Sequence, residues 1–137
     1  MSTEIDMSGK IEQTQWDTII ALSNDIEYAI VLSKRTKRHL QTLFRNLNTP
    51  RMFIYKTFAA LISLIFKEVK LKSKVIIDLE YFGHQDLLKT QILEYVNQLK
   101  IRVTPIFEFG FVGKNSHSHI LAEQVAYKKR KRIRKLL

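Results

Sequence analysis

The sequence predicts one α/β domain built on a mixed sheet of five strands. Runs of β-branched and alternating apolar residues occupy the chain as far as Ser33, a texture typical of strands. Apolar residues at helical spacing follow, and Val75–Glu80 is then a β-branched run with the character of a buried parallel strand. The resulting order, β-β-β-α-α-β-α-β-α, joins three antiparallel strands to two parallel ones, because right-handed crossovers return a strand in parallel.

Three consecutive strands are expected first, at Thr3–Ser8, Trp16–Ser23 and Glu27–Ser33. Gly9-Lys10 lets the chain turn after the first strand, and Asn24-Asp25 forms the turn before the third. Connections this short favour an antiparallel meander.

Two helices are expected next. The first has apolar residues at helical spacing, namely Leu40, Leu43, Phe44 and Leu47. Thr49 can cap the second helix and Pro50 can open it. The second helix, at about residues 50–69, is apolar on most sides and is therefore expected to be the central core helix.

The second half of the chain alternates strands and helices. The expected elements are the strand Val75–Glu80, a helix at about Asp86–Leu99, a strand after Pro105, and a last helix from Ser116 to Tyr127. The strand after Pro105 carries an aromatic alternation, Phe107, Phe109 and Phe111. This alternation favours a core face over a base-stacking surface, because side chains two apart share one face of a strand.

The composition limits the class of protein. The chain has 137 residues of which 45% are hydrophobic, enough for one compact core. It has no cysteine, which excludes a disulfide scaffold, a thiolate nucleophile and a Cys-ligated metal. The longest apolar stretch, Phe58–Phe66, is too short to cross a bilayer, and the first residues lack a signal-peptide pattern. We therefore expect a cytoplasmic protein with no membrane association.

Positive charge gathers at the C-terminus. The net charge is +10, and residues 128–137 form a basic C-terminal arm that follows a nearly balanced single domain at 1–127. The cations of this arm are Lys128, Lys129, Arg130, Lys131, Arg132, Arg134 and Lys135. Clustered cations of this kind attract phosphate groups, so DNA or RNA is the expected partner. A solubilising tail or contact with other anionic surfaces stays open.

Two aspartates, Asp6 and Asp78, each lie within an apolar, strand-like run. A buried carboxylate is costly unless it is paired or binds a metal. If the fourth strand pairs with the first, the two aspartates become neighbours at the switch point where α/β sheets bind ligands. The alternatives are a local turn or cap at Asp6, and a salt bridge at a strand end for Asp78 and Glu80.

Three motifs in this order carry a resemblance to a known family. They are Ile5-Asp6-Met7-Ser8-Gly9, Val75-Ile76-Ile77-Asp78-Leu79-Glu80-Tyr81 and the segment from Gly113 to Glu123. Their order and placement resemble the ribonuclease H-like superfamily, which includes ribonuclease H, Holliday-junction resolvases and transposases. The resemblance implies helices on both faces of the five-stranded sheet. It also implies that two Mg²⁺ or Mn²⁺ ions, held by acids from separate elements, hydrolyse phosphodiester bonds in DNA or RNA.

The resemblance also implies the catalytic metal ligands. They are Asp6, Asp78, Glu80, His119 and Glu123. The third motif departs from the family pattern, because the superfamily usually presents an acid where this chain has His119. Glu123 lies one helical turn later on the same face, and a histidine ligand would favour Mn²⁺. Which of the two binds, or whether the site is degenerate, stays open.

Other residues are expected close to the same cleft. Lys10 and Lys114 would lie near it and could steer phosphates, and His84 could transfer a proton there. Two other functions remain open: a non-catalytic nucleic-acid-binding protein with a degenerate site, and a small ribosome-associated or chromatin-like basic protein. A homodimer also stays open, because junction-cutting relatives act as symmetric dimers.

Overall fold

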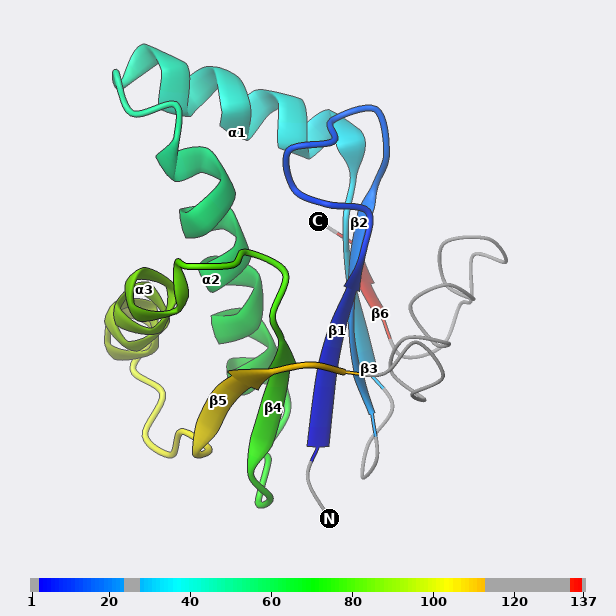
Figure 1. Cartoon of the computed structure of the whole chain (residues 1–137), viewed down its shortest axis with the longest axis vertical. Helices are drawn as coiled ribbons and strands as arrows, with labels where there is room; N and C mark the ends of the chain where they lie inside the picture. Colours follow the sequence, from blue (N-terminus) through cyan, green and yellow to red (C-terminus); the bar gives the residue numbers. More distant parts are fainter. Residues whose placement is uncertain (1–2, 24–27, 113–133, 137) are drawn as a thin grey trace.

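The computed structural model describes residues 3–23, 28–112 and 134–136, and these ranges form one sheet with three helices (Figure 1). The elements are β1 (Thr3–Ser8), β2 (Thr18–Ser23), β3 (Tyr28–Leu32), α1 (Lys34–Asn46), α2 (Met52–Glu68), β4 (Val75–Asp78), α3 (Gln85–Gln98), β5 (Phe107–Gly110) and β6 (Arg134–Leu136). The strand order across the sheet is β5-β4-β1-β2-β3-β6.

The strand pairing confirms the expected mixed sheet. β1, β2 and β3 form an antiparallel meander, and β4 then returns beside β1 in parallel. Ile5 pairs with Ile77 in that register, and β5 pairs in parallel with β4. The α/β class, three antiparallel strands and two parallel additions are thus all present, as the right-handed crossover rule requires.

The sixth strand was not expected. β6 pairs in parallel with β3, with Ile30 opposite Lys135. Arg134 and Lys135 belong to the predicted basic arm, but their backbone extends the sheet at the edge beyond β3. The expected last helix, Ser116–Tyr127, lies outside the described residues.

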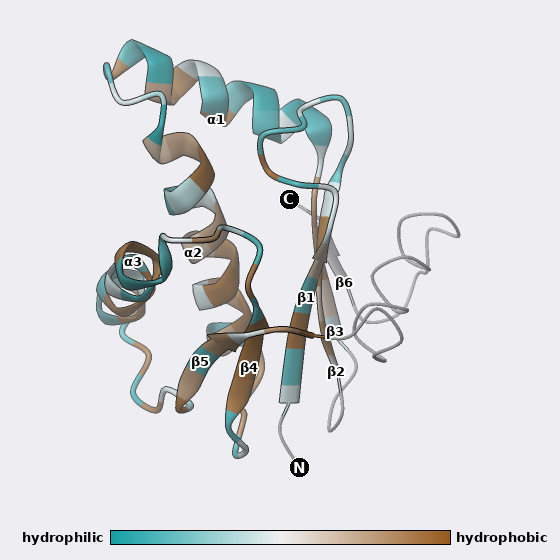
Figure 2. Ribbon diagram, viewed as in Figure 1, coloured by the Kyte–Doolittle hydropathy of each residue, from teal (hydrophilic) through white to brown (hydrophobic). Residues whose placement is uncertain are grey.

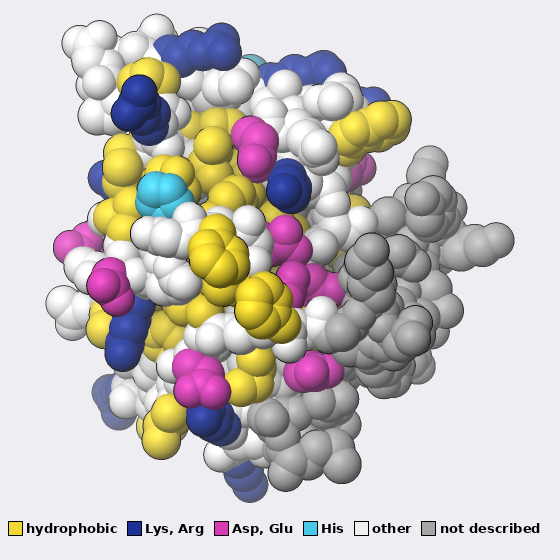
Figure 3. All heavy atoms as spheres, in the orientation of Figure 1, with side chains coloured by type: hydrophobic (Ala, Val, Ile, Leu, Met, Phe, Trp, Pro, Cys, Tyr) yellow, Lys and Arg dark blue, Asp and Glu magenta, His cyan; other side chains and the backbone are white. Residues whose placement is uncertain are grey.

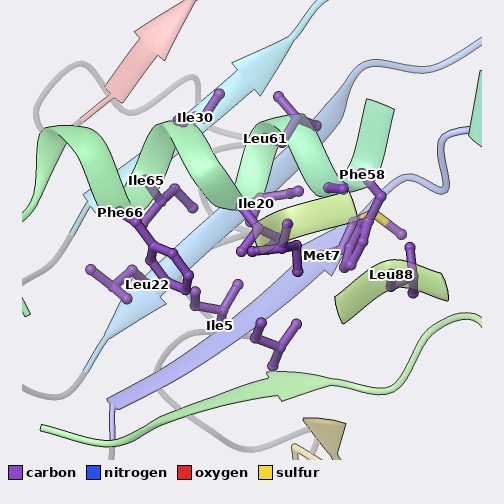
Figure 4. Packing of buried hydrophobic residues seen from close by; sticks show 14 of the residues in the cluster. Ile5, Met7, Ile20, Leu22, Ile30, Phe58, Leu61, Ile65, Phe66 and Leu88 are labelled. Atoms are coloured by element: carbon purple, nitrogen blue, oxygen red, sulfur yellow. The ribbon is translucent and has the colours of Figure 1, made fainter. Parts of the chain in front are cut away.

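The two faces of the sheet have different partners. Ile5 and Met7 on β1 join the main core with α2 and α3, as do Ile20 and Leu22 on β2 (Figure 4). Successive side chains of a strand point to opposite faces. A second buried cluster therefore forms on the other face, from Ile19, Ala21, Ala29 and Val31. In the described part of the chain, α1, α2 and α3 all lie on one side of the sheet (Figure 1).

α2 is the core helix, as its composition predicted. Its buried residues include Phe58, Ile62 and Ile65, each no more than 2% exposed. Burial of such a side chain stabilises the fold by about 1.5–3 kcal/mol. α2 packs against α3, where the buried hydroxyl of Ser63 reaches the carbonyl oxygen of Ile92 at 3.5 Å. The brown colour of α2 in Figure 2 contrasts with the teal of α1.

α1 extends beyond the core. Ser33 caps it, since its hydroxyl oxygen accepts a hydrogen bond from the Thr36 amide at 3.2 Å. Of the four apolar residues at helical spacing, Leu40 and Phe44 pack against the core, whereas Leu43 and Leu47 are 51% and 60% exposed. None of the helices in the described ranges combines the length and apolar character needed to cross a membrane.

Candidate metal centre

Three acidic side chains, from β1, from β4 and from the loop after β4, come together at one end of the sheet. Asp6 lies on β1, Asp78 is the last residue of β4, and Glu80 follows in the next loop. Each offers a carboxylate oxygen that lies within 4.8 Å of those of the other two. In the described part of the chain this is the one such group of three. Figure 3 shows acidic side chains gathered near the centre of this view, beside hydrophobic ones.

The parallel register explains why Asp6 and Asp78 meet. Ile5 and Ile77 are paired, so the two aspartates stand one position further along neighbouring strands. Because Ile5 and Ile77 face the helices, strand alternation directs both aspartates to the opposite face. The prediction that these residues become neighbours is confirmed.

Backbone amides orient two of the carboxylates. Asp6, only 3% exposed, accepts a hydrogen bond from the Met7 amide at 2.8 Å. Asp78 accepts one from the Val112 amide at 2.9 Å, which ties the chain after β5 to the end of β4. The Leu79 amide also donates to the Gly110 carbonyl at 2.8 Å. The bonds donated by the Val112 and Leu79 amides hold the ends of β4 and β5 against each other.

Glu80 lies in the environment least favourable to a negative charge. Burial raises its pKa to about 8, and so do a hydrogen bond with Asp78 and the negative charges of Asp78 and Asp6. The positive charge of Lys10 acts in the opposite direction and lowers the pKa. The protonated form of Glu80 is therefore favoured well above the pH at which an ordinary glutamate loses its proton.

The three carboxylates fit a hard divalent cation. Mg²⁺ prefers oxygen ligands at about 2.1 Å, so two ligand atoms on opposite sides of one ion lie about 4.2 Å apart. The 4.8 Å limit on the separations among Asp6, Asp78 and Glu80 requires only small side-chain movements to reach that geometry. A divalent cation bound there would also balance the negative charge of the cluster.

The loop after β1 is held close to this cluster by a buried lysine. Lys37 on α1 is fully buried, and its ammonium group donates to the carbonyls of Lys10 and Gln13 at 3.1 and 2.7 Å. It also donates to the Thr18 hydroxyl at 2.9 Å, which in turn donates to the Gly9 carbonyl at 2.7 Å. Burial lowers the pKa of Lys37 to about 8, although Asp17 and Glu12 oppose that shift.

Tyr81 joins the same loop from the other side. Its hydroxyl accepts a hydrogen bond from the Ile11 amide at 3.2 Å and donates one to Glu12 at 3.1 Å. Burial, with a smaller contribution from the charge of Glu12, raises the pKa of Tyr81. Lys37 and Tyr81 thus fix the loop that carries Lys10. Sequence reasoning missed the roles of both residues, because Lys37 belongs to no motif and Tyr81, the last residue of the second motif, was given no role there.

The remaining predicted site residues are elsewhere or outside the described ranges. Lys10 is exposed, with its charge acting on Glu80. His84 pairs with Tyr55 of α2, where ring nitrogen and hydroxyl are 3.1 Å apart. The residues outside the described ranges are Lys114, His119, Glu123, Lys128, Lys129, Arg130, Lys131 and Arg132.

The three alternating phenylalanines, Phe107, Phe109 and Phe111, lie in two different environments. Phe107 and Phe109 are half-buried and pack against the main core, as a core face requires. Phe111 lies beyond the end of β5 and is 79% exposed, so the core interpretation was wrong for this residue. Its ring is a neighbour of Phe82, which is 73% exposed.

Comparison of the chain with protein-family models, with curated proteins and with solved structures found no match. The functional assignment therefore depends on the chemistry of the site itself.

Proposed function

We propose that this protein is a divalent-metal-dependent nuclease of the ribonuclease H-like type that hydrolyses phosphodiester bonds in DNA or RNA. The observation that supports it best is the convergence of Asp6, Asp78 and Glu80 from separate segments of the chain. Two other features agree with it: the parallel placement of β4 beside β1, and the net charge of +10.

Each residue of the site has a role in this proposal. Asp6, Asp78 and Glu80 hold Mg²⁺ or Mn²⁺ through oxygen atoms, and Met7 and Val112 orient the two aspartates through their amides. Bound ions of this kind activate a water molecule and stabilise the leaving oxygen of a phosphodiester. Lys10 supplies a nearby positive charge for the phosphate. His119 or Glu123 would complete the ligand set.

The substrate itself would be attracted by positive charge outside the cluster. The C-terminal lysines and arginines neutralise backbone phosphates, an interaction that does not depend on base sequence. Further cations, including Arg35 and Arg38, lie exposed along α1. The acidic cluster would repel phosphates when it is free of metal. Metal binding and substrate binding near the cluster would therefore support each other.

A cleavage assay tests the proposal. Purified protein is incubated with single-stranded DNA, single-stranded RNA, a hybrid duplex and a branched junction, each with Mg²⁺, Mn²⁺ or a chelator. We expect metal-dependent cleavage of at least one substrate, with its loss in Asp6→Asn and in Asp78→Asn. Glu94→Gln, an exposed acid on α3, is the matched control and should keep full activity. Activity that survives both aspartate substitutions would refute the assignment.

The alternative is a nucleic-acid-binding protein without catalysis. The raised pKa of Glu80 favours it, because a protonated Glu80 reduces the negative charge of the cluster without a metal. In that case the four substrates would bind but none would be cut, and Mn²⁺ would produce no heat of binding in calorimetry.

A further inference from the structure

Two exposed aromatic rings stand beside the acidic cluster. Phe82 and Phe111 are 73% and 79% exposed, and their ring centroids are 6.4 Å apart with 35° between the planes. Single apolar residues on a surface are ordinary, but two large rings in contact with each other and with water mark a binding surface more often. We call Phe82 and Phe111 the aromatic pair.

The aromatic pair is attached to the candidate metal ligands through short, fixed segments. Phe82 follows Glu80 by two residues, and Phe111 directly precedes Val112, whose amide binds Asp78. The Leu79 amide bonds the carbonyl of Gly110. Both rings therefore project from the carboxyl ends of parallel strands, the edge at which α/β sheets bind ligands.

The backbone next to Phe82 is not crowded. A Cβ added at Gly83 would meet no atom within 4 Å other than those of its two chain neighbours. The other aromatic side chains of this region behave differently, since Phe107 and Phe109 pack on the core. Phe82 and Phe111 thus differ in exposure from the two phenylalanines within β5.

We propose that the aromatic pair stacks on unpaired nucleobases, so that the substrate of the nuclease is single-stranded nucleic acid or an unpaired region. This inference rests on the proposed function. Every nucleobase has a π-face that can stack on phenylalanine, and such stacking strengthens binding roughly 5- to 150-fold per base. A duplex hides those faces, so the pair discriminates unpaired from paired substrates. Phe82 lies two residues after Glu80. A base stacked on this ring would therefore place its own phosphate near Asp78 and Glu80.

The test measures binding without cleavage. A fluorescein-labelled 15-mer of thymidine and a duplex of the same length are titrated with protein in EDTA, and again with Ca²⁺, and anisotropy is followed. We expect Phe82→Ala and Phe111→Ala each to weaken single-strand binding about 10-fold, with less than about a twofold change for the duplex. Val103→Ala, at another exposed apolar residue, is the matched control and should bind like the wild type.

A second measurement reports stacking directly. In Phe111→Trp the indole keeps the ring, so single-strand affinity should be retained and the new fluorescence should fall when the oligonucleotide binds. Equal losses for single strand and duplex in the alanine variants would overturn the inference, as would unchanged single-strand binding. A change in oligomeric state without a change in nucleic-acid binding would also overturn it, and would identify a protein-contact surface instead.

The two proposals fail in different ways. If Asp6→Asn and Asp78→Asn leave cleavage intact, the metal site is refuted while the stacking measurements are unaffected. If the alanine variants bind single strands normally while cleavage still requires both aspartates, only the stacking role is refuted.

Discussion

The carboxylates of Asp6 and Asp78 face each other across two adjacent parallel strands, with oxygen atoms no more than 4.8 Å apart. Charges this close repel one another unless a proton or a cation lies between them. Glu80, within the same distance, adds a third acid. The free energy of the folded state should therefore depend on metal concentration and on pH.

Metal binding should stabilise the wild-type protein and not the aspartate variants. A ligand that binds only the folded state adds about 2.7 kcal/mol at a concentration 100 times its Kd. We expect Mn²⁺ to raise the melting temperature of the wild type by several degrees, measured by calorimetry after chelator treatment. Asp6→Asn should be at least as stable as the wild type without metal, because it removes a crowded charge, and should lose the metal-dependent rise. Glu94→Gln should respond to Mn²⁺ as the wild type does.

The pKa of Glu80 predicts a pH dependence for the metal-free protein. The folded-state pKa is about 8 against an ordinary value of 4.5, so the folded state binds more protons between these values. The free energy of unfolding should therefore fall as pH rises from about 4.5 to about 8. We expect a loss of about 1–2 kcal/mol, below the full linkage value because water partly screens the side chain. Urea unfolding at pH 5 and pH 8.5 in EDTA measures it.

Glu80→Gln separates this effect from other titrations. Glutamine keeps the shape and a hydrogen-bonding group but cannot ionise, so the variant should lose that part of the pH dependence and exceed the wild type in stability at pH 8.5. An identical pH profile in the two proteins would show that Glu80 does not titrate in this range.

The lowered pKa of Lys37 predicts that the free energy of unfolding changes with pH in the opposite direction. Its folded-state pKa is about 8 against an ordinary value of 10.5, so the unfolded state binds more protons between these values. Stability should therefore rise with pH across that window, since the cost of burying a charged ammonium disappears. The difference in unfolding free energy between the wild type and Lys37→Met, measured in urea at pH 7 and pH 9.5, should increase with pH.

Lys37→Met should also loosen the loop after β1. The part-buried carbonyls of Lys10 and Gln13 would lose their ammonium donor, which costs less than the roughly 1–3 kcal/mol of a fully buried acceptor. We expect faster proteolysis within residues 10–17 at neutral pH. Lys34→Met, at an exposed lysine of the same helix, is the matched control and should leave the cleavage rate unchanged.

Gly9 and Gly83 form a natural pair for testing backbone strain. Both have a positive φ, +76° and +81°, which costs about 1 kcal/mol for a residue with a side chain. At Gly9 an added Cβ would also collide with the Asp17 carbonyl, whereas at Gly83 it would meet nothing. Gly9→Ala should therefore destabilise the protein by about 2 kcal/mol more than Gly83→Ala in urea unfolding. Equal losses of stability in the two variants would show that the loop after β1 moves to accommodate a Cβ at position 9.

The meeting of Asp6 and Asp78 could be predicted because it follows from rules that act at a distance. A parallel strand after a helix pair must return beside an existing strand, and a carboxylate within an apolar run needs a partner. The approach of Glu80 to this pair could be predicted from its spacing, because residues two apart on a strand share one face. These inferences needed only the order of elements and the position of each acid within its strand.

Lys37 and Phe111 could not be predicted, since their surroundings are set by non-local packing. Lys37 resembles Lys34 and Arg38 in sequence, and only the path of the loop after β1 buries it. Phe111 continues the alternation of Phe107 and Phe109, but β5 ends at Gly110. β6 was missed because its residues are mostly cationic, a composition typical of a solvated arm.

The C-terminal charges should control nucleic-acid affinity through salt. Truncating the arm would also remove β6, so neutralisation is the sharper change. Replacing Lys128, Lys129, Arg130, Lys131 and Arg132 with glutamine removes five positive charges and keeps Arg134–Leu136 intact. If all five meet phosphates, the slope of log affinity against log salt for a single strand should become less negative by up to about 3.5. Anisotropy titrations between 50 and 200 mM KCl measure that slope. The variant should bind all sequences more weakly at low salt, and an unchanged slope would show that these cations do not contact phosphates.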